Sequence, residues 1–308
     1  MTVDVIIPSY KPGRSFHELL RRLEAQTLKP GHILIINTEE KYFDPSLTEG
    51  IASAEVFHIT KAEFDHGATR NMGAGFSNAD ILVFMTDDAM PADRHLIANL
   101  AGAFSEPSIK AVWARQLPGK NCPLIEGFTR RFNYPEEPSV RREADLGKYG
   151  IKTFFCSNVC AAYDRGYFNA MGGFTEPCIF NEDMIFGGRT IRSGMAIAYA
   201  PEAKVYHSHD YNAIEQFHRY FDNGVSQAMH PEVFRGVASS GEGMKLVRAT
   251  MRFLTERKKG YLIPSLIFTS GMKFLGFRLG RLYRHLPLSL IKAFSLNKTF
   301  WDKKMTVD

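Results

Sequence analysis

The feature that most constrains the fold is an alternation of short apolar runs with helix-like segments over the first 115 residues. Five runs have the composition of buried strands, at residues 3–7, 32–36, 55–59, 80–85 and 110–115. Three intervening segments, 15–26, 69–77 and 93–104, place apolar residues at helical spacing. Strands that alternate with helices in this way form a mainly parallel sheet covered by helices. The sequence therefore predicts an α/β fold for this part of the chain.

Polar residues follow four of these runs, and in two cases they come directly after an expected strand. The four groups are Ser9-Tyr10-Lys11, Asn37-Thr38-Glu39, Asp65-His66-Gly67 and Thr86-Asp87-Asp88. Ligands of open α/β sheets bind in the crevice beyond the carboxyl ends of the strands. We therefore expect the ligand-binding residues of this part of the chain among these four groups.

The rest of the chain divides into a mixed middle section and a helical tail. Residues 116–210 contain a polar stretch (134–149), an apolar segment (153–163), an acidic helix start (181–193) and a strand-like piece (196–206). Beyond residue 211, apolar and basic residues recur at helical spacing in 214–224, 244–257, 264–285 and 288–294. Lys273, Arg278 and Arg281 interrupt the most apolar of these segments, so we expect no membrane-spanning helix.

Charge is distributed unevenly along the chain. Residues 245–308 carry 14 Lys and Arg against 3 Asp and Glu, a net +11, whereas residues 1–244 carry 24 against 30, a net −6. A basic end on an acidic body fits an anionic surface, either a membrane or a nucleic acid. A solvated helical face is the alternative explanation of such a pattern.

The cysteines and the N-terminal residues indicate the cellular compartment in which the protein is expected. The four cysteines, at 122, 156, 160 and 178, show no C-x-x-C spacing, so neither a zinc site nor a disulfide framework is favoured. The N-terminal run MTVDVIIPSY lacks the basic start, apolar stretch and small-residue cleavage site of a secretory signal. We expect a reducing, cytoplasmic setting.

The pair Asp87-Asp88 is the strongest local signal for chemistry. It follows the apolar run ILVFM at 81–85, and two carboxylates at a strand end offer hard oxygen ligands to a divalent ion. Mg²⁺ is typically held by one or two protein carboxylates together with substrate phosphates. The alternative is a polar turn that caps a helix beginning near Pro91.

Two further groups contain residues suited to catalysis or metal binding. Asn181-Glu182-Asp183 stands at an expected helix start, where a carboxylate is commonly a cap stabilised by the helix dipole. His207 and His209 are two residues apart and share one side of an extended strand, although such pairs are commonly hydrogen-bonded surface residues. Neither group identifies a function by itself.

The order of these motifs resembles the family 2 glycosyltransferases of GT-A fold. The matching runs are IIPSYK at 6–11, HGATRN at 66–71, TDD at 86–88 and NED at 181–183, and the resemblance extends over about residues 1–225. A narrower set is similar to the bacterial rhamnosyltransferase branch: FDHGATRN at 64–71, ARQLP at 114–118, FNYP at 132–135, FFCSN at 154–158, VYHSH at 205–209 and FHRYFDNG at 217–224.

This resemblance implies a domain organisation. Residues 1–225 are expected to form a GT-A catalytic domain with a mixed, mainly parallel sheet, in which 1–115 bind the nucleotide and 116–225 the acceptor. Residues 226–308 are expected to form a basic amphipathic helical extension.

The resemblance also implies roles for individual residues in an inverting transfer by single displacement. Asp183 would be the catalytic base, and Asp88, helped by His207, would coordinate Mg²⁺ or Mn²⁺. The expected donor contacts are the nucleotide pocket for Pro8, Ser9 and Tyr10, the base for Asp65, the diphosphate for Arg70 and the ribose or deoxyribose for Asp87. The acceptor candidates are Arg115, Gln116, Ser157, Asn158 and Glu182, for which hydrogen bonding within the protein is the alternative.

One position departs from the family pattern. The loop after the second strand usually carries an acidic residue, and here it reads Asn37-Thr38-Glu39-Glu40. The Asn37 amide can hydrogen-bond the base or the sugar, but it is uncharged and pairs differently from a carboxylate.

The resemblance implies L-rhamnose transfer from dTDP-β-L-rhamnose to a glycan or lipid-linked acceptor in bacterial cell-surface polysaccharide synthesis. The tail interleaves Lys and Arg with Phe and Leu, as a helix on an anionic leaflet requires, which predicts a peripheral location on the inner face of the cell membrane. Packing of the tail on the catalytic domain, or on a second copy in a homodimer, is the alternative.

Three other functions compete with this one. A UDP-hexose-dependent transferase of the same family would share most motifs, and a catalytically silent nucleotide-sugar-binding scaffold would share the fold. Nucleic-acid binding rests on the basic tail alone, without a recognisable reading motif, so we expect no nucleic-acid partner.

Overall fold

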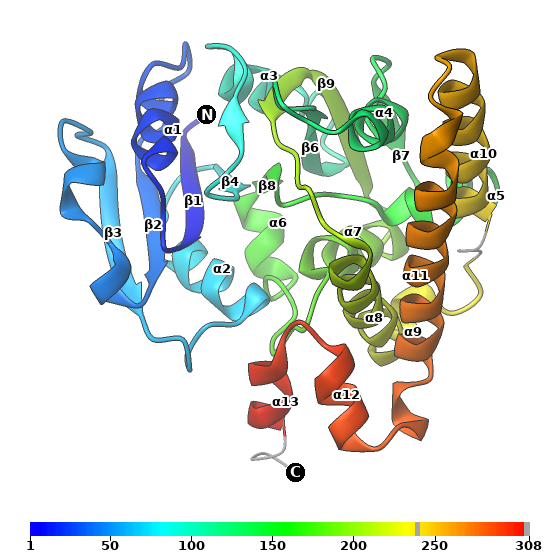
Figure 1. Ribbon diagram of the computed structural model, residues 1–308. Helices are drawn as coiled ribbons and strands as arrows, with labels where there is room; N and C mark the ends of the chain where they lie inside the picture. Colours follow the sequence, from blue (N-terminus) through cyan, green and yellow to red (C-terminus); the bar gives the residue numbers. More distant parts are fainter. Residues whose placement is uncertain (238–240, 305–308) are drawn as a thin grey trace.

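One mixed β-sheet organises the protein (Figure 1). The computed structural model describes residues 1–237 and 241–304 of the 308-residue chain. Within these residues nine strands join in the order β3-β2-β1-β4-β8-β6-β9-β5, and β7 also pairs with β9. The strands are β1 (Val3–Tyr10), β2 (Ile33–Thr38), β3 (Ala54–Ile59), β4 (Ile81–Met85), β5 (Met90–Pro91), β6 (Ile109–Leu117), β7 (Ser139–Arg141), β8 (Cys160–Asp164) and β9 (Ala196–Tyr206).

The pairing directions bring six carboxyl ends to one edge of the sheet. The neighbours β3, β2, β1 and β4 run parallel, and β8 runs antiparallel to both β4 and β6. Because β9 is parallel to β6, the strands β1, β2, β3, β4, β6 and β9 all end at the same edge. The loop that precedes β8 lies at this edge too, since β8 runs the opposite way. This arrangement collects residues from distant parts of the sequence.

Helices cover both faces of the sheet, and further helices follow β9. They are α1 (Ser15–Glu24), α2 (His66–Gly75), α3 (Leu96–Gly102), α4 (Leu124–Asn133), α5 (Leu146–Tyr149), α6 (Arg165–Ala170), α7 (Glu182–Arg192), α8 (Ala213–Met229), α9 (Pro231–Phe234), α10 (Gly241–Glu256), α11 (Ile263–Arg281), α12 (Leu288–Phe294) and α13 (Lys298–Lys304). Short 3₁₀ helices occur at Glu40–Tyr42, Pro45–Thr48, Glu143–Asp145, Gly150–Phe154, Gly260–Leu262 and Tyr283–His285.

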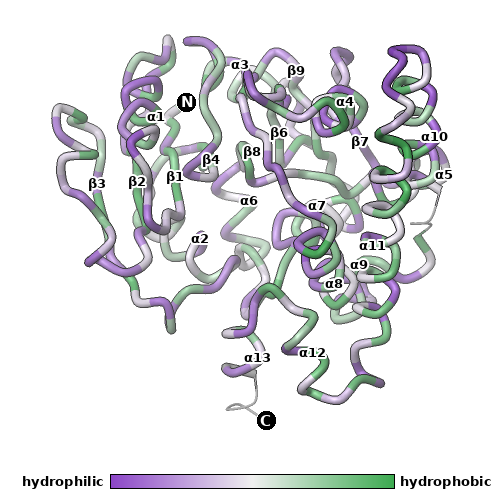
Figure 2. Tube along the Cα trace, viewed as in Figure 1, coloured by the Kyte–Doolittle hydropathy of each residue, from purple (hydrophilic) through white to green (hydrophobic). Residues whose placement is uncertain are grey.

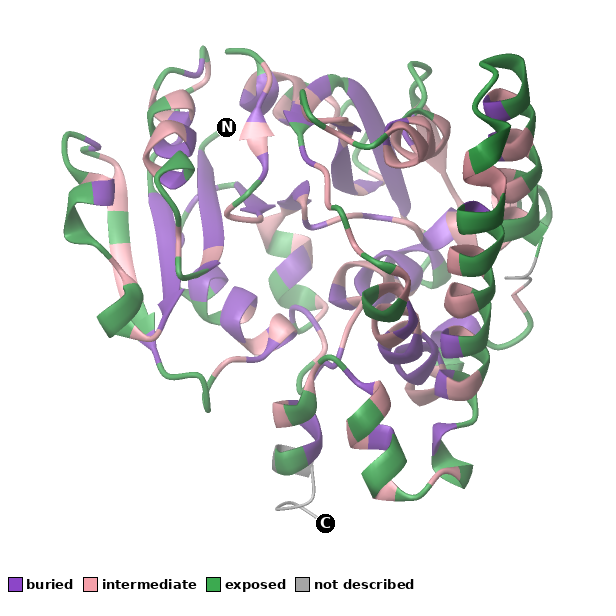
Figure 3. Cartoon of the chain, viewed as in Figure 1, coloured by how far each residue is buried: buried purple, intermediate pink, exposed green. Residues whose placement is uncertain are grey.

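Alternation along the strands supplies a separate core on each face. In β1, Val5 and Ile7 point to one face and Ile6 to the other, as the two-residue period of a strand requires. The first face packs against α1 and α3; α1 buries Phe16, Leu19, Leu20 and Leu23 at helical spacing. The second face packs against α2, α6, α7 and α9 and contains a group of touching aromatic rings: Phe84, Tyr163, Phe168, Phe174 and Phe186. Buried residues are concentrated in this central part of the molecule (Figure 3).

The C-terminal helices pack on the rest of the protein through α8. Residues of α8, α12 and α13 share a third apolar cluster, which includes Phe221, Val225, Ile291 and Trp301. Glycines bring α11 close to α8: a Cβ atom at Gly276 would lie 2.3 Å from the Phe217 carbonyl oxygen, and one at Gly280 would lie 2.1 Å from that of Phe221. The expected boundary after residue 225 falls inside α8, and the division at 115/116 falls inside β6, because neither segment is interrupted there.

The expected strands are all present, and the last of them coincides with β9. The segment expected as apolar at 153–163 forms β8 together with a 3₁₀ turn. The polar stretch at 134–149 contains strand β7, which the sequence did not predict because three residues give no measurable alternation. In the described part of the chain, no helix is long and apolar enough to cross a membrane.

Candidate active site

Most of the candidate site residues lie at the edge of the sheet where six strands have their carboxyl ends. Asp88 follows β4 and His207 follows β9, while Asn158 precedes β8 at the same edge. Ser9 of β1 lies beside Asn37 of β2, which lies beside His58 of β3. The site is therefore assembled from strand ends that are remote in sequence, as in other open α/β sheets.

Asp88, His207 and His209 form a candidate metal site. His207 Nε2 lies 3.4 Å from Asp88 Oδ1, and His209 Nε2 lies 3.7 Å from Asp88 Oδ2. One ligand atom from each residue lies within 4.8 Å of the others. Burial opposes ionisation of Asp88, but the hydrogen bond and charge of His207 outweigh it and hold the Asp88 pKa below its usual value. Burial and the neighbouring His207 lower the pKa of His209 to about 4, so this imidazole is neutral at neutral pH, as a metal ligand must be.

A second set of contacts orients His207. Gln116 Oε1 lies 3.1 Å from His207 Nδ1, and the Arg130 guanidinium of α4 contacts both Gln116 Oε1 and His207 Nδ1. With an ion bound in place of the Nε2 proton, His207 would be neutral: Nδ1 would keep its proton and donate to Gln116, and the Nε2 lone pair would be the ligand. Gln116, expected to bind the acceptor, is buried and supports the candidate metal site.

Asp183 lies in the first turn of α7 and is partly exposed. Its Oδ2 accepts a hydrogen bond from the Asn158 backbone N–H at 2.9 Å, and its Oδ1 accepts one from the Met184 N–H at 2.7 Å. Burial and the adjacent charge of Glu182 raise the pKa of Asp183 to about 7. A carboxyl group with such a pKa is matched to proton abstraction near neutral pH.

Glu182 faces inward and pairs with Arg70. Arg70 Nη1 lies 3.2 Å from Glu182 Oε1, and both side chains are only 7% exposed. The Asn158 side-chain amide donates to the same Glu182 oxygen at 3.1 Å, and the Tyr163 hydroxyl donates to Asn158 Oδ1 at 2.8 Å. Burial favours the neutral acid, but Arg70 outweighs it and lowers the Glu182 pKa. The fixed negative charge beside Asp183 is thus stabilised by a buried cation.

A continuous series of contacts joins the two centres. His207 contacts Gln116, and Gln116 Nε2 donates to the Ser157 hydroxyl at 3.0 Å. Ser157 precedes Asn158, whose backbone N–H binds Asp183. The candidate metal site and the candidate base are therefore positioned by one hydrogen-bonded group of residues.

The motif DHGATRN holds the segment that leads to Asp183. Asp65 caps α2 through Gly67 N and Ala68 N, and its other oxygen accepts from Cys178 N at 2.8 Å. The Asn71 amide donates to the Phe174 carbonyl and accepts from the Phe174 N–H, both at 2.8 Å. Asp65 and Arg70 thus contact residues 174–182 in this structure, and their expected contacts with the donor stay predictions.

The expected nucleotide residues line the end of β1 and β2. The Tyr10 N–H donates to Asp87 Oδ2 at 3.3 Å, and Tyr10 is 44% exposed beside the ring of Tyr42, with 5.9 Å between ring centroids. Lys11 lies 4.3 Å from the Tyr42 ring centroid and 5.1 Å from that of Tyr10. An exposed aromatic pair with a cation suits a nucleotide, because a base can stack there and the ammonium can meet its phosphates.

Asn37 is fully buried at the end of β2. Its Nδ2 lies 3.0 Å from His58 Nδ1, while its Oδ1 has no hydrogen-bond partner among the described residues. A buried, unpaired amide oxygen at this edge can accept a hydrogen bond from an N–H group of a bound base. Pro8 and Ser9 of the neighbouring strand β1 lie opposite Ile36 and Asn37.

Some residues differ from the expectation in their surroundings. Arg115, expected near the acceptor, pairs with Glu136 at 2.9 Å, and Glu182 is buried in its pair with Arg70. His209, Arg130 and Tyr42 join the site without having been assigned to it from the sequence. The two-residue spacing of His207 and His209 was the signal for the former, whereas Arg130 and Tyr42 belong to segments whose position only the fold reveals.

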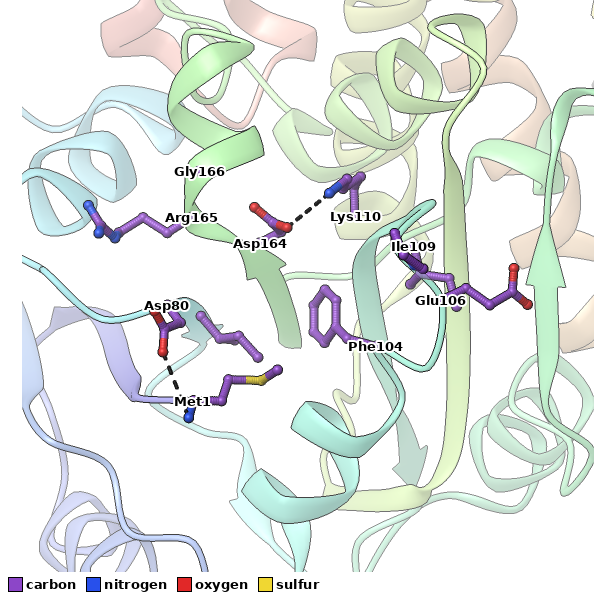
Figure 4. A pocket seen from close by; sticks show the side chains of 11 residues that line it. Met1, Asp80, Phe104, Glu106, Ile109, Lys110, Asp164, Arg165 and Gly166 are labelled. Carbon is purple, nitrogen blue, oxygen red and sulfur yellow. Dashed lines mark hydrogen bonds and ion pairs between the residues drawn. The ribbon is translucent and has the colours of Figure 1, made fainter.

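A separate hollow lies at the opposite end of the sheet (Figure 4). It has a volume of about 400 Å³ and includes Met1, Asp80, Phe104 and the ion pair between Lys110 and Asp164, whose charged atoms are 3.0 Å apart. Met1 and Asp80 precede β1 and β4, so this hollow faces the amino ends of the parallel strands. It is not continuous with the carboxylates at the other edge.

Residues 4–172 match the family profile described as "Glycosyl transferase family 2". The chain belongs to this family of glycosyltransferases. It is 38% identical over 304 residues to "O-antigen chain rhamnosyltransferase RfbN" of Salmonella typhimurium (strain LT2), with 98% of this chain and 96% of that protein covered. It is 36% identical over 304 residues to "O-antigen chain rhamnosyltransferase WbaN" of Salmonella anatum, with 97% and 95% covered. The resemblance to the rhamnosyltransferase branch is confirmed.

Solved structures establish the same fold. A mannosyltransferase from Pyrobaculum calidifontis, in complex with GDP-Man and Mn²⁺, superposes with a TM-score of 0.56 at 14% identity, covering 97% of this chain and 84% of that one. TarS 1-349 of S. aureus, in complex with UDP-GlcNAc, superposes with a TM-score of 0.50 at 14% identity, covering 92% of each chain. The predicted GT-A fold is confirmed, and the protein is a glycosyltransferase.

Proposed function

We propose that this glycosyltransferase transfers L-rhamnose from dTDP-L-rhamnose to a glycan or lipid-linked acceptor in the synthesis of a bacterial O-antigen-type polysaccharide. The names of both Salmonella relatives, which match nearly the whole chain, support the sugar and the pathway. The main support for sugar transfer is that the same edge of the sheet holds two centres. One is Asp183, a partly exposed carboxyl group of raised pKa, and the other is the cluster of Asp88, His207 and His209.

A divalent metal ion fits this cluster. One carboxylate and two imidazoles converge within 4.8 Å, and two imidazoles favour a transition-metal ion such as Mn²⁺ over Mg²⁺, which prefers oxygen. The mannosyltransferase of similar fold was solved with Mn²⁺, which supports the same choice here. When bound, such an ion would stabilise the negative charge of the departing diphosphate.

The reaction itself requires a base and no protein nucleophile. In a single displacement, the acceptor hydroxyl attacks the anomeric carbon, the bond to the diphosphate oxygen breaks, and the configuration inverts. Asp183 takes the hydroxyl proton, a contribution of about 10²- to 10⁴-fold in rate. The N–H groups of Asn158 and Met184 orient its two oxygens, so the carboxylate is held for the incoming hydroxyl.

In this proposal the donor nucleotide would lie at the ends of β1, β2 and β4. The unpaired Asn37 oxygen supports a contact with the imide N–H of thymine, which a carboxylate would otherwise make. Tyr10, Tyr42 and Lys11 would flank the nucleotide, and Asp87 would bind its deoxyribose.

A lipid-linked acceptor would place the reaction at a membrane surface. The net charge of +11 over residues 245–308 supports a peripheral location on the inner, anionic face of the cell membrane.

A donor panel tests this proposal. Release of nucleotide is measured with dTDP-L-rhamnose and with UDP- and GDP-hexoses, each with Mn²⁺. We expect dTDP-L-rhamnose to give the highest kcat/KM. Preference for a UDP-hexose would instead make the protein a UDP-hexose transferase of this family, and no release from any donor would favour a catalytically silent scaffold.

A further inference from the structure

The outward face of α11 is a row of large apolar side chains. Their exposed fractions are 55% for Ile267, 63% for Phe268, 66% for Phe274, 48% for Leu275 and, just beyond the helix, 51% for Leu282. The spacings between them keep these residues on one side of the helix, because residues three, four, seven and eight positions apart share a face. Figure 3 shows exposed residues along the outside of α11, and Figure 2 shows hydrophobic residues along the same helix.

The opposite face of α11 is already covered. Gly276 and Gly280 touch the backbone of α8, and Leu266 is buried. A helix that is apolar all round is normally buried on every side. Single exposed apolar residues are common on protein surfaces, but several large ones on one face of a helix mark a surface that contacts something else.

Charge indicates what covers this row. No acidic residue occurs between Glu256 and Asp302 in the sequence, and α11 carries the exposed cations Arg278 and Arg281. A second copy packed on this face would bring two equally basic surfaces together, which is unfavourable. An anionic lipid leaflet would take up the apolar side chains and attract the cations together.

We propose that the outward face of α11, from Ile267 to Leu282, lies on an anionic lipid leaflet with the helix axis parallel to the membrane plane. The helix is about 28 Å long, which suits an interfacial rather than a spanning element. The inference rests on the proposed function only in that a lipid-linked acceptor gives this contact a purpose; the donor site does not depend on it.

The test is co-sedimentation of the full chain with lipid vesicles. We expect the native protein to bind vesicles that contain phosphatidylglycerol, and to bind vesicles of phosphatidylcholine alone less well. The double variant Phe268→Glu/Phe274→Glu should bind the anionic vesicles at least about tenfold more weakly, because both aromatic side chains are lost and two negative charges are added.

The control is Phe76→Glu, which makes the same substitution at a residue that is 44% exposed at the end of α2. It should bind vesicles as the native chain does. Equal vesicle binding by the double variant and the native protein would overturn the proposal. So would a native dimer that the double variant abolishes, with no vesicle binding, because a second copy would then cover the face.

Nucleotide release from dTDP-L-rhamnose without vesicles separates this proposal from the proposed function. We expect the double variant to keep native release in solution. Native vesicle binding without nucleotide release would contradict the function alone, whereas release without vesicle binding would contradict the membrane contact alone.

Discussion

Asp183 and Glu182 lie side by side at the start of α7, and their repulsion makes this turn sensitive to pH. Glu182 keeps its charge because Arg70 pairs with it, so the proton of the pair resides on Asp183. At the residue scale, catalysis therefore depends on which of these two adjacent carboxyl groups is ionised.

The first prediction concerns the acid limb of the pH profile. The base must be ionised to accept a proton, so kcat/KM should fall about tenfold per pH unit below a pKa of about 7. In Glu182→Gln the like charge is removed, the Asp183 pKa falls, and the limb should move to lower pH. Glu202→Gln, at a side chain that is 73% exposed, should leave it in place. An unchanged limb in Glu182→Gln would contradict this origin of the shift.

The second prediction separates binding from chemistry. Asp183→Asn should reduce kcat for transfer by about 10²- to 10⁴-fold and leave donor affinity within a few-fold of native, since the residue acts on the acceptor hydroxyl. Calorimetric titration with dTDP in Mn²⁺ checks affinity, and product analysis checks transfer. Lost nucleotide affinity would place Asp183 in the donor site instead.

The third prediction concerns the metal ligands. Asp88→Ala and His209→Ala should each weaken Mn²⁺ binding, measured by the electron paramagnetic resonance signal of the free ion, at least about tenfold. His32→Ala, at a histidine that is 57% exposed and paired with Glu55, is the matched control and should bind as native. Native affinity in His209→Ala would remove this residue from the metal site.

Candidate site residues could be identified from the sequence more completely than the residues that contact them in the fold. Asp88 and His207 lie together as expected, because each directly follows a strand whose end could be located. His209 was observed but not assigned, since spacing alone does not distinguish a ligand from a surface histidine. The ion pair between Arg70 and Glu182 was not predicted, because it joins two helices whose paired residues are 112 positions apart in the chain.

At the scale of elements, those with strong apolar periodicity could be predicted from the sequence, whereas short elements could not. The strands β1 to β4 and β9 agree with the expected runs, since each is an apolar stretch bounded by turn residues. Helix α2 begins at His66, three residues before the expected start, because the Asp65 cap and not an apolar stripe determines its first turn. Strand β7 depends on pairing with β9, which is a tertiary effect.

The fourth prediction tests the contact between α8 and α11. In Gly280→Ala the added methyl group would meet the Phe221 carbonyl at 2.1 Å, so the helices must separate. We expect the free energy of unfolding to fall by about 1–3 kcal/mol. Gly271→Ala, on the same helix with no atom within 4 Å, should be neutral or stabilising by about 0.5–1 kcal/mol. Chemical denaturation compares the two; equal stabilities would contradict the close contact.

At the scale of the whole molecule, the candidate catalytic and metal-binding residues gather at one edge of the sheet, and the C-terminal helices carry the basic charge. The α/β alternation and the charge division were both legible from the sequence. The packing of the tail was not, because the glycines of α11 are ordinary helix residues until α8 is known to lie against them. The order of β8 between β4 and β6 likewise requires the assembled sheet.

The central claim is metal-dependent transfer from a nucleotide-activated sugar at Asp88, His207 and His209. The most direct test is nucleotide release from dTDP-L-rhamnose by metal-depleted protein, measured before and after Mn²⁺ is restored. Release should be absent without metal, return with Mn²⁺ in the native chain, and stay absent in Asp88→Ala. Undiminished release by the native chain in excess EDTA would contradict the account.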